Sequence, residues 1–581
     1  MNLTEEQRDF VRSESNALLT ACPGSGKTRV IIAKLLSCTI QTCDTARKVA
    51  CITYTNAGVN EIESRVHRYG YLDIDEYAEV STIHSFCLNN VLRNFYWLLP
   101  DYSNGIEVLP SDSEMYQDIV TEFCQRYGLD DFARDLFSQL NRNPDGTPTS
   151  DTLEAQIALE FWDCLRERGY IDYCNIVYLS FLLLKQYPFL ARGLGARFAW
   201  ILVDEFQDTS SLQVEILGLI ARCGKTKFAL VGDPCQSIFR FAGARPDLMV
   251  SFATQIEASS DFHLTGNFRS SSRIIVHAER LYHRTPPMQA VGETRDDSID
   301  PQYYNSMSRF IAITEHYIPA LLEHGIPYGG AAILSPNWFT LFPLGRQLRE
   351  YGIPVVGPGA RPYRRLNLFA PLAEHLCAYA EEPTPDKIRG ITRELFNLLL
   401  QITGRPYFEI YGYEGRFVTM RLLRIAVDLR AQWEQAERWL LAASEEFANV
   451  LVAAGYLPIT QSNILQESAQ AMVTEIRRNR IDLANLTVSD LGVFSNPTGS
   501  MKLLSLHSAK GREFDAVALV SLHEREIPNW RAGTAEEIEE YKRMFYVGIT
   551  RARRLLMYFT DRERPGNVPS RFLGPLGVQL I

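Results

Sequence analysis

A glycine-rich segment near the N-terminus has the residue types and spacing of a phosphate-binding loop. Residues 21–28 read Ala-Cys-Pro-Gly-Ser-Gly-Lys-Thr and lie between the apolar run 17–20 and the run 29–36, which suits a helix. The glycines let the chain curl so that backbone N–H groups surround a phosphate at the start of that helix. Lys27 then reaches the β- and γ-phosphates, and the Thr28 hydroxyl binds Mg²⁺. The segment therefore predicts a site for a nucleoside triphosphate and Mg²⁺.

Two further segments carry side chains that suit the same chemistry. The apolar run 198–203 is followed by Asp204 and Glu205, and the apolar run 228–232 is followed closely by Gln236. We expect Asp204 to hold Mg²⁺ and Glu205 to orient or deprotonate the attacking water. Gln236 can sense the γ-phosphate. Without the phosphate loop, a charged loop after a buried strand would be the better interpretation of the two acids.

Composition and charge narrow the class of protein. The chain has 581 residues with 46% hydrophobic content, which suggests about four domains of roughly 150 residues. No apolar run approaches the ~20 residues that span a bilayer, and the N-terminus is acidic where a signal peptide is basic, so we expect a cytoplasmic protein without a membrane partner.

The eleven cysteines form no Cys-x-x-Cys pair and predict neither a zinc site nor a disulfide framework. The formal charge of −10 argues against indiscriminate coating of nucleic acid but leaves room for a local basic and aromatic groove.

The elements that must position these groups are expected to be parallel strands with helices between them. The β-rich run 48–56 and the run 81–87 both end in polar and aromatic side chains. The carboxyl ends of parallel strands line the ligand crevice of an α/β sheet, so both runs could face a polymer that lies across it. Alone, each would be a core strand followed by a capped helix. Near the N-terminus, the amide of Gln7 matches the edge of adenine, although without the neighbouring site it would be interpreted as a surface glutamine.

These motifs, in this order, resemble those of superfamily 1A DNA helicases of the UvrD, Rep and PcrA type. The resemblance continues through segments 264–270, 504–514 and 545–553 and covers nearly the whole chain. It implies an α/β fold with two RecA-like P-loop domains, built from parallel sheets flanked by helices, each with a mainly helical inserted subdomain. The expected bounds are 1–90 and 191–265 for the ATP-binding domain, 91–190 for its helical insert, 266–362 and 491–581 for the second RecA-like domain, and 363–490 for the second helical insert.

The resemblance also implies ATP hydrolysis and roles for individual residues. Arg269 and Arg551 match the family's two arginine-bearing motifs and would reach the γ-phosphate as arginine fingers. Phe268 and Arg29 would sandwich the adenine, while Gln7 would read its edge. The implied catalytic set is Lys27, Glu205, Gln236, Arg269 and Arg551. The implied cofactor-binding set is Gln7, Gly24, Ser25, Gly26, Lys27, Thr28, Arg29, Asp204, Phe268 and Glu513, with Thr28 and Asp204 holding Mg²⁺ and Glu513 binding the ribose.

A further group of residues matches family positions that contact single-stranded DNA. Stacking on aromatic rings is worth roughly 1–3 kcal/mol per base and is indifferent to base identity, which suits a motor that steps along any sequence. For Phe239, a position in the apolar core remains the alternative. The expected DNA-binding set is Tyr54, Asn56, His84, Phe239, Phe241 and His507.

The sequence departs from the family pattern at four positions. Ala242 stands where the family has arginine, Ala57 where it has lysine, and Arg512 where it has an apolar residue. Phosphate contacts, or the coupling of ATP to DNA, would therefore be weaker or arranged differently, which bears on processive unwinding more than on ATP hydrolysis. Phe268 replaces a tyrosine and keeps its stacking face.

Three functional classes remain open. The first is a DNA-translocating helicase with 3′→5′ polarity that acts on single-stranded DNA or on DNA with a single-stranded tail. The second is an ATP-dependent sensor subunit that binds DNA ends with little unwinding. The third, an RNA-directed superfamily 1B motor, fits poorly because residues 204–208 read Asp-Glu-Phe-Gln-Asp, the 1A form of that motif.

The compact layout bears on the biological partner. The sequence ends soon after the Arg551 motif, so we expect no fused nuclease domain. Together with segments 21–24 and 82–87, this compactness is similar to the helicase subunit GajB of the Gabija anti-phage system, which works beside a separate GajA nuclease. We therefore expect a separate nuclease partner, docked on an insert surface that includes part of 91–190, with general DNA repair as the alternative.

Overall fold

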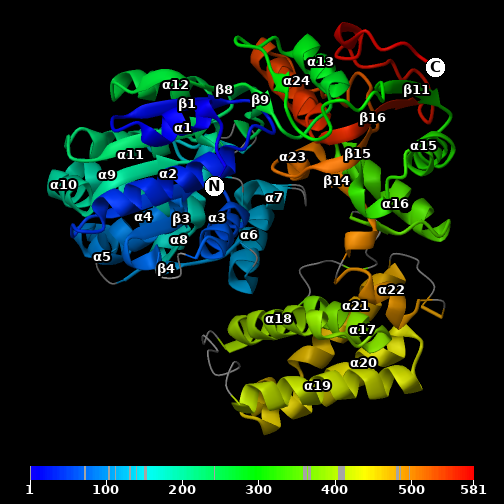
Figure 1. Ribbon diagram of the computed structural model, residues 1–581. Coiled ribbons are helices and arrows are strands. Elements are labelled where there is room, and N and C mark those ends of the chain that lie inside the picture. Colours follow the sequence, from blue (N-terminus) through cyan, green and yellow to red (C-terminus); the bar gives the residue numbers. More distant parts are fainter. Residues whose placement is uncertain are drawn as a thin grey trace. The chain divides into compact units, whose positions relative to one another are not determined.

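The computed structural model (Figure 1) consists of parallel sheets with helices between the strands. It describes residues 2–581 except 71–73, 103–104, 112, 130–132, 139, 150–152, 241–242, 358–362, 364–367, 404–412, 479–482, 485 and 496. The predicted DNA contact Phe241 and the departure at Ala242 lie outside the described residues.

The chain divides into two compact units. The first comprises Met1–Asp300, Ile527–Arg554 and Arg571–Gly577, and the second comprises Pro301–Glu526, Leu555–Ser570 and Val578–Ile581. Segments 266–300 and 527–554 thus pack within the first unit. The finer division into four domains stays a prediction.

Six parallel strands form the sheet of the first unit, in the order β3-β2-β6-β7-β1-β8. All residues of β6 are buried, as expected of a strand covered on both faces. The strand bounds are β1 (Ala17–Ala21), β2 (Lys48–Thr53), β3 (Ala78–Thr82), β6 (Phe198–Val203), β7 (Lys227–Gly232) and β8 (Ser259–Leu264), with a separate parallel pair, β9 (Gly266–Asn267) and β10 (Gln289–Ala290).

Helices cover both faces of this sheet. The bounds of these helices are α1 (Glu5–Arg12), α2 (Lys27–Thr42), α3 (Asn56–Arg68), α4 (Ile83–Cys87), α5 (Arg93–Phe95), α9 (Tyr173–Gln186), α10 (Pro188–Arg197), α11 (Ser211–Ala221) and α12 (Asp247–Gln255). The first unit also contains α13 (Ser272–Leu281) and α24 (Ala535–Ile549), which pack against each other. Leu18 and Leu230 enter one core with α9, α10 and α11, whereas Leu19 and Val231 enter another with α1 and α2. Because successive side chains of a strand point to opposite faces, this alternation produces three layers.

The expected helical segment 91–190 contains two kinds of helix. α6 (Glu114–Tyr127), α7 (Ala133–Ser138) and α8 (Ala155–Glu167) surround a core of their own that includes Phe123 and Phe161. α9 and α10 instead share the core of the first sheet. A short parallel pair, β4 (Glu107–Val108) and β5 (Tyr170–Ile171), lies beside the helices.

The second unit contains another six-stranded sheet, in the order β11-β16-β15-β12-β14-β13. The pairs β11–β16, β12–β14, β12–β15 and β13–β14 are parallel. The bounds are β11 (Gln302–Ser306), β12 (Ala331–Ser335), β13 (Val355–Val356), β14 (Met501–Ser505), β15 (Phe514–Leu519) and β16 (Ala552–Asp561), with α14 (Arg309–Ile311), α15 (Ile318–Glu323), α16 (Leu341–Glu350) and α23 (Leu506–Ala509).

A helical block follows β13 in the chain. Its helices are α17 (Ala370–Glu381), α18 (Pro385–Thr403), α19 (Tyr413–Gln432), α20 (Ala436–Ala453), α21 (Ile464–Arg478) and α22 (Val488–Gly492). Their apolar faces close over one core, centred on side chains such as Trp439 and Phe447, which are fully buried. The prediction that 363–490 is mainly helical agrees with these elements.

Among the described residues, no single helix is long and apolar enough to cross a bilayer, and only the sharply bent pair α9 and α10 has the combined length and composition to do so. All eleven cysteines are free thiols.

Candidate nucleotide and DNA sites

The phosphate loop joins β1 to α2 and leaves the start of that helix open. Gly26 precedes α2 with a left-handed φ of 83°, and no side chain caps the helix there. Gly24 is also left-handed, and a Cβ at this position would lie 2.7 Å from both Arg269 Cβ and Asn267 Oδ1. The loop thus needs glycine and presents uncapped N–H groups, the arrangement that binds a phosphate.

Gln7 is tied to the phosphate loop rather than to solvent. Its side chain caps α1 reciprocally with Thr4, and its Nε2 donates to the Ser25 carbonyl at 2.9 Å. Only 2% of Gln7 is exposed. The structure therefore brings Gln7 to the nucleotide site, and its reading of adenine stays a prediction.

Lys27 lies among carboxylates. Its Nζ is 3.4 Å from Glu205 Oε2. Burial alone would lower the pKa of Lys27, but Glu205, Asp233 and Asp204 outweigh it and hold the pKa above its ordinary value. Lys27 therefore stays charged, as a phosphate ligand requires.

The two acids after β6 differ in environment. Burial, reinforced by the neighbouring Glu205 carboxylate, raises the pKa of Asp204 to about 7. A divalent cation beside Asp204 would offset both effects, which fits a metal ligand. Glu205 is more exposed and has a left-handed φ of 51°, an uncommon conformation for a residue with a side chain. That conformation turns the chain immediately after β6. Backbone conformations that are uncommon for the residue type concentrate at functional sites.

Gln207 links the acids to the next strand end. Its Nε2 donates to Glu205 Oε2, and its Oε1 accepts from the backbone N–H of Asp233 at 2.9 Å. Gln207 is fully buried. The side chain therefore fixes the position of Glu205 relative to the loop that follows β7.

Asp233 is the centre of a buried polar network that the sequence did not predict. Its carboxylate forms an ion pair with Arg284 and accepts from Gln236 Nε2 at 2.6 Å. Arg284 also donates to the Tyr546 hydroxyl at 3.2 Å, and these carboxylate and phenolic partners raise its pKa despite the opposing effect of burial. A lone arginine after a helix carries no sequence signal, so only the fold identifies this residue.

The two predicted arginine fingers come together beside the same strand end. Arg551 Nη2 donates to Gln236 Oε1 at 3.2 Å, and Arg269 Nη1 donates to the Thr550 carbonyl at 3.1 Å. Arg551 is almost fully buried. The structure thus gathers Gln236, Arg269 and Arg551, although their roles toward a γ-phosphate stay predictions.

The predicted adenine-stacking residues flank the same loop. Phe268 donates its backbone N–H to the Gly24 carbonyl at 2.9 Å and leaves its ring exposed. Arg29, on the first turn of α2, is also exposed. The predicted ribose ligand Glu513 and the predicted DNA contact His507 lie in the second unit, before β15 and in α23.

Two of the predicted DNA contacts meet in the first unit. The rings of Tyr54 and Phe239 stack with centroids 5.2 Å apart and an interplanar angle of 19°. Both rings are only partly buried, which contradicts an ordinary core position for Phe239. Asn56 is exposed at the start of α3.

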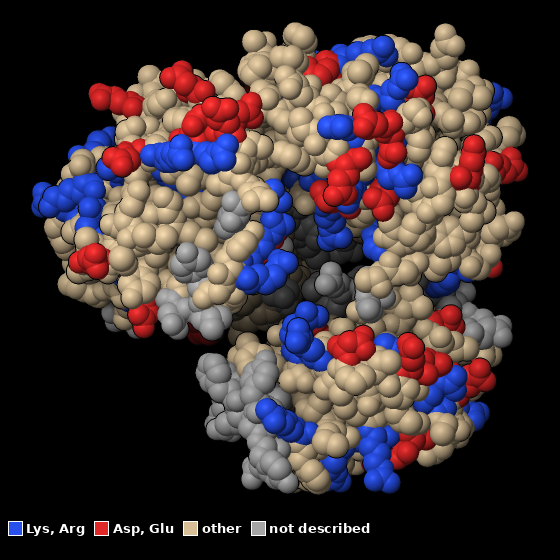
Figure 2. Space-filling view, in the orientation of Figure 1, with Lys and Arg blue, Asp and Glu red and all other residues tan. Residues whose placement is uncertain are grey.

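His84 faces a polar cavity of about 220 Å³. Other lining residues include Arg142 and Arg240, and burial lowers the pKa of His84, which keeps its imidazole neutral at pH 7. Acidic and basic side chains are intermixed on the face shown in Figure 2. The role of His84 and its neighbours in DNA contact stays a prediction.

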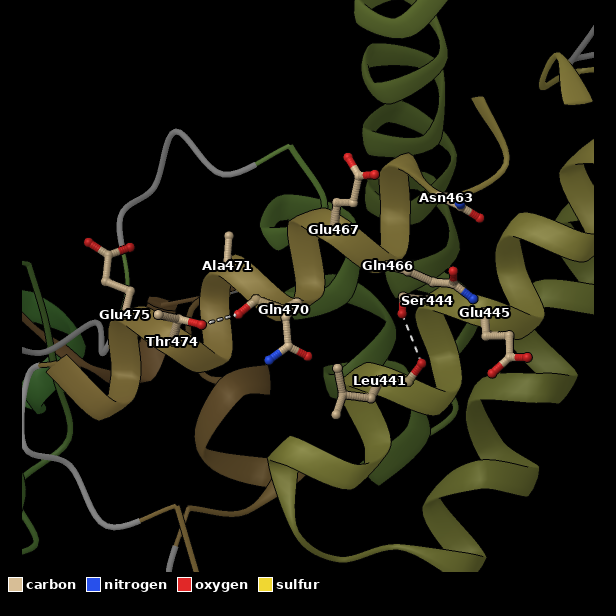
Figure 3. Close-up of a pocket in the computed structure, with 10 residues that line it drawn as sticks. All are labelled: Leu441, Ser444, Glu445, Asn463, Gln466, Glu467, Gln470, Ala471, Thr474 and Glu475. Carbon is tan, nitrogen blue, oxygen red and sulfur yellow. Dashed lines mark hydrogen bonds between the residues drawn. The ribbon is translucent and has the colours of Figure 1, made fainter. Parts of the chain in front are cut away.

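A wide groove of about 920 Å³ lies on the helical block, between α20 and α21 (Figure 3). Three carboxylates line it together with amides and small apolar side chains. Its lining residues are Leu441, Ser444, Glu445, Asn463, Gln466, Glu467, Gln470, Ala471, Thr474 and Glu475. Without lysine or arginine among them, this groove lacks the cationic side chains that attract phosphate.

The parallel sheet with helices on both faces and the glycine loop before α2 define a P-loop nucleoside triphosphatase. Two family models match the chain: the UvrD/REP helicase N-terminal domain over residues 3–257 and the UvrD-like helicase C-terminal domain over residues 461–562. Together they span more than half of the sequence, and the chain belongs to the UvrD/REP family of helicases. The predicted α/β fold with parallel sheets flanked by helices is confirmed.

Full-length relatives agree with this assignment. ATP-dependent DNA helicase Rep of Buchnera aphidicola subsp. Schizaphis graminum is 24% identical, over 99% of this chain and 96% of its own length. ATP-dependent DNA helicase PcrA of Staphylococcus epidermidis is 24% identical, over 100% of this chain and 87% of its own length. PcrA of Staphylococcus aureus is similar at 24% identity, with 86% of its length covered.

Proposed function

We propose that this chain moves 3′→5′ along single-stranded DNA and uses ATP hydrolysis to unwind the duplex ahead of it. As a member of the UvrD-like family it is an ATP-hydrolysing DNA helicase, so the proposal concerns direction, residues and partners. The observation that most supports the coupling of ATP hydrolysis to movement is the hydrogen bond between Gln236 and Arg551. This contact joins a strand end beside the phosphate loop to an expected arginine finger.

ATP with Mg²⁺ fits the residues at the phosphate loop. The start of α2 is uncapped, Gly24 has no space for a Cβ, and Lys27 is held charged. Thr28 and Asp204 would hold Mg²⁺, which when bound neutralises phosphate charge. These are the groups that an anionic triphosphate and a hard cation require.

Each residue around the phosphate loop has its own role in ATP hydrolysis. Lys27 binds the β- and γ-phosphates, and Glu205, oriented by Gln207, accepts the proton of the attacking water. Arg551 and Arg269 supply positive charge where negative charge develops on the γ-phosphoryl oxygens. Gln236, held by Asp233, keeps Arg551 close to that position.

Tyr54 and Phe239 provide the DNA contact that ATP hydrolysis would move. Their stacked rings form a partly exposed aromatic surface in the unit that carries the phosphate loop. Because every base has a π-face, such a surface holds a strand without reading its sequence.

Unwinding of tailed duplexes tests the direction. With ATP and Mg²⁺, the protein should separate a duplex with a 3′ single-stranded tail and leave one with a 5′ tail intact, and Glu205→Gln should separate neither. Single-stranded DNA should also raise the ATPase rate. Unwinding from the 5′ tail alone would refute the polarity, and ATP-dependent binding without unwinding of either duplex would identify a DNA-end sensor instead.

For the biological role, we propose that the helicase works beside a separate nuclease in anti-phage defence. A protein partner is supported by apolar side chains that are exposed within 91–190, such as Trp97 and Phe189, and that the motor does not need. Co-expression with the neighbouring genes followed by size-exclusion chromatography tests it. Co-elution of a nuclease supports defence, whereas elution of this chain alone favours the alternative, a general DNA-repair helicase.

A further inference from the structure

We propose that Trp338, Phe339 and Phe342 form an aromatic platform on the second unit that stacks the bases of single-stranded DNA. The inference rests on the proposed function and assigns a DNA contact that no motif of the chain predicts. The three residues follow β12 in the turn and helix at Trp338–Thr340 and α16.

The rings of the platform lie together and face solvent. The centroids of Trp338 and Phe339 are 4.1 Å apart with an interplanar angle of 30°, and those of Trp338 and Phe342 are 5.1 Å apart. The exposed fractions are 45% for Trp338, 56% for Phe339 and 42% for Phe342. Three adjacent large rings left this open form an apolar patch, and such patches mark binding surfaces.

Buried hydrogen bonds hold the turn that presents these rings. The Ser335 and Thr340 hydroxyls are 2.6 Å apart, and both residues are buried. Asn337 caps the short helix, because its Oδ1 accepts from the Phe339 N–H at 2.9 Å. The platform is therefore pre-formed, and a ligand would lose little conformational entropy of the protein on binding.

The platform lies at the edge of the sheet where a predicted DNA motif also lies. Ser335, the last residue of β12, pairs with Ser505, the last residue of β14. From these two neighbouring parallel strand ends, the chain continues on one side into the platform and on the other into α23, which carries His507. Ligands of parallel sheets bind at this carboxyl edge, so the two segments can contact one strand of nucleic acid.

Single-stranded DNA is the occupant that this surface fits best. Near-parallel rings such as those of Trp338 and Phe339 give flat faces of the size of a base, which a protein partner does not require. Arg346 is exposed on α16 four residues after Phe342, so it places a basic side chain on the same side of the helix. The rings and Arg346 follow a strand end next to the one that leads to His507, a predicted DNA contact. They therefore lie beside the expected path of the single-stranded DNA.

Binding of two oligonucleotides tests the platform. The full chain is titrated into labelled oligothymidylate and into an abasic oligonucleotide of equal length, and Kd is measured by fluorescence anisotropy at one salt concentration. The Trp338→Ala/Phe339→Ala variant should bind oligothymidylate about tenfold more weakly or worse, since base stacking is worth roughly 1–3 kcal/mol. Its Kd for the abasic strand should stay unchanged. Tyr351→Ala, which removes another exposed ring at the end of α16, is the control and should behave as wild type.

The outcomes separate this inference from the proposed function. Unchanged binding of oligothymidylate by the variant, with tight binding by wild type, overturns the platform and leaves the helicase function intact. Equal weakening for both oligonucleotides also overturns it, because a backbone contact would then be responsible. Failure of wild type to bind either strand refutes the proposed function itself. Circular dichroism verifies folding, and the Trp338→Tyr/Phe339→Tyr variant, which keeps two rings, should retain wild-type affinity.

Discussion

The guanidinium of Arg551 donates to the side-chain oxygen of Gln236 at 3.2 Å, across 315 residues of sequence. The same amide donates to Asp233 through its nitrogen, so its orientation is set by a buried carboxylate. An expected arginine finger is thereby connected to the strand end beside the phosphate loop. Four predictions follow from this site and its surroundings, each with its own measurement.

Arg551→Ala should lower kcat for ATP hydrolysis about 10³-fold or more, because an arginine finger stabilises charge in the transition state. The KM for ATP should change little, since Lys27 and the loop N–H groups still bind the phosphates. Steady-state ATPase assays with single-stranded DNA measure both constants. Arg562→Ala, an exposed arginine after β16, is the matched control. A kcat within about threefold of wild type would remove Arg551 from the catalytic set.

Glu205→Gln should bind ATP and DNA but hydrolyse ATP very slowly, because the amide keeps the shape of the side chain and cannot accept a proton. Its hydrogen bond from Gln207 survives the change, so the loop should not rearrange. Equilibrium binding of a fluorescent ATP analogue and single-turnover hydrolysis separate the two effects. Normal hydrolysis in the presence of DNA would exclude Glu205 as the base.

Arg284→Met should destabilise the protein by about 3–5 kcal/mol, because it leaves the fully buried Asp233 carboxylate without its cation. Adding Asp233→Asn should recover much of that stability, since position 233 then no longer carries an unpaired buried charge. Activity should stay low in the double variant, because Gln236 loses the carboxylate that orients its amide. Urea unfolding of the four proteins in the cycle gives the coupling energy. Additive effects of the two substitutions would contradict the pairing.

His277 predicts a pH dependence of stability. Burial on α13, helped by the nearby Arg280, lowers the pKa of His277 to about 4 from its ordinary value of 6.5. Between these values the unfolded chain binds more protons than the folded chain, so the free energy of unfolding falls as the pH falls from 6.5 toward 4.

His277→Gln should flatten this slope by up to about 1.4 kcal/mol per pH unit. Urea unfolding at several pH values between 4.5 and 7.5 measures it. His283→Gln, in which the replaced imidazole is largely exposed, should keep the wild-type slope. Identical slopes for wild type and His277→Gln would show that His277 does not contribute.

Much of the nucleotide site could be predicted from contiguous residues. The glycine spacing before Lys27 encodes the loop, because left-handed backbone and the start of a helix are local properties. Apolar runs such as Phe198–Val203 encode buried parallel strands in the same way. The pairing of acids after such a strand then predicted the roles of Asp204 and Glu205.

The partners of these groups could not be predicted locally. Arg284 has no motif, and only the packing of α13 and α24 brings it to Asp233 and Tyr546. Gln7 was predicted to meet a nucleotide, yet its bond to Ser25 depends on how α1 packs against α2. Such contacts join residues that are distant in the chain, so the hydrophobic periodicity of the sequence does not indicate them.

The sequence by itself therefore determined the elements and the order of the strand-end motifs, because backbone propensity and hydrophobic alternation act over a few residues. It also predicted a phosphate-binding loop. Only the tertiary structure decided which side chains meet: Tyr54 with Phe239, Gln236 with Arg551, and Trp338 with Phe339 and Phe342 at an exposed sheet edge. The physical reason is that burial and exposure are properties of the packed layers. The same aromatic side chain can fill a core or face solvent, and its own neighbours in the sequence do not distinguish the two.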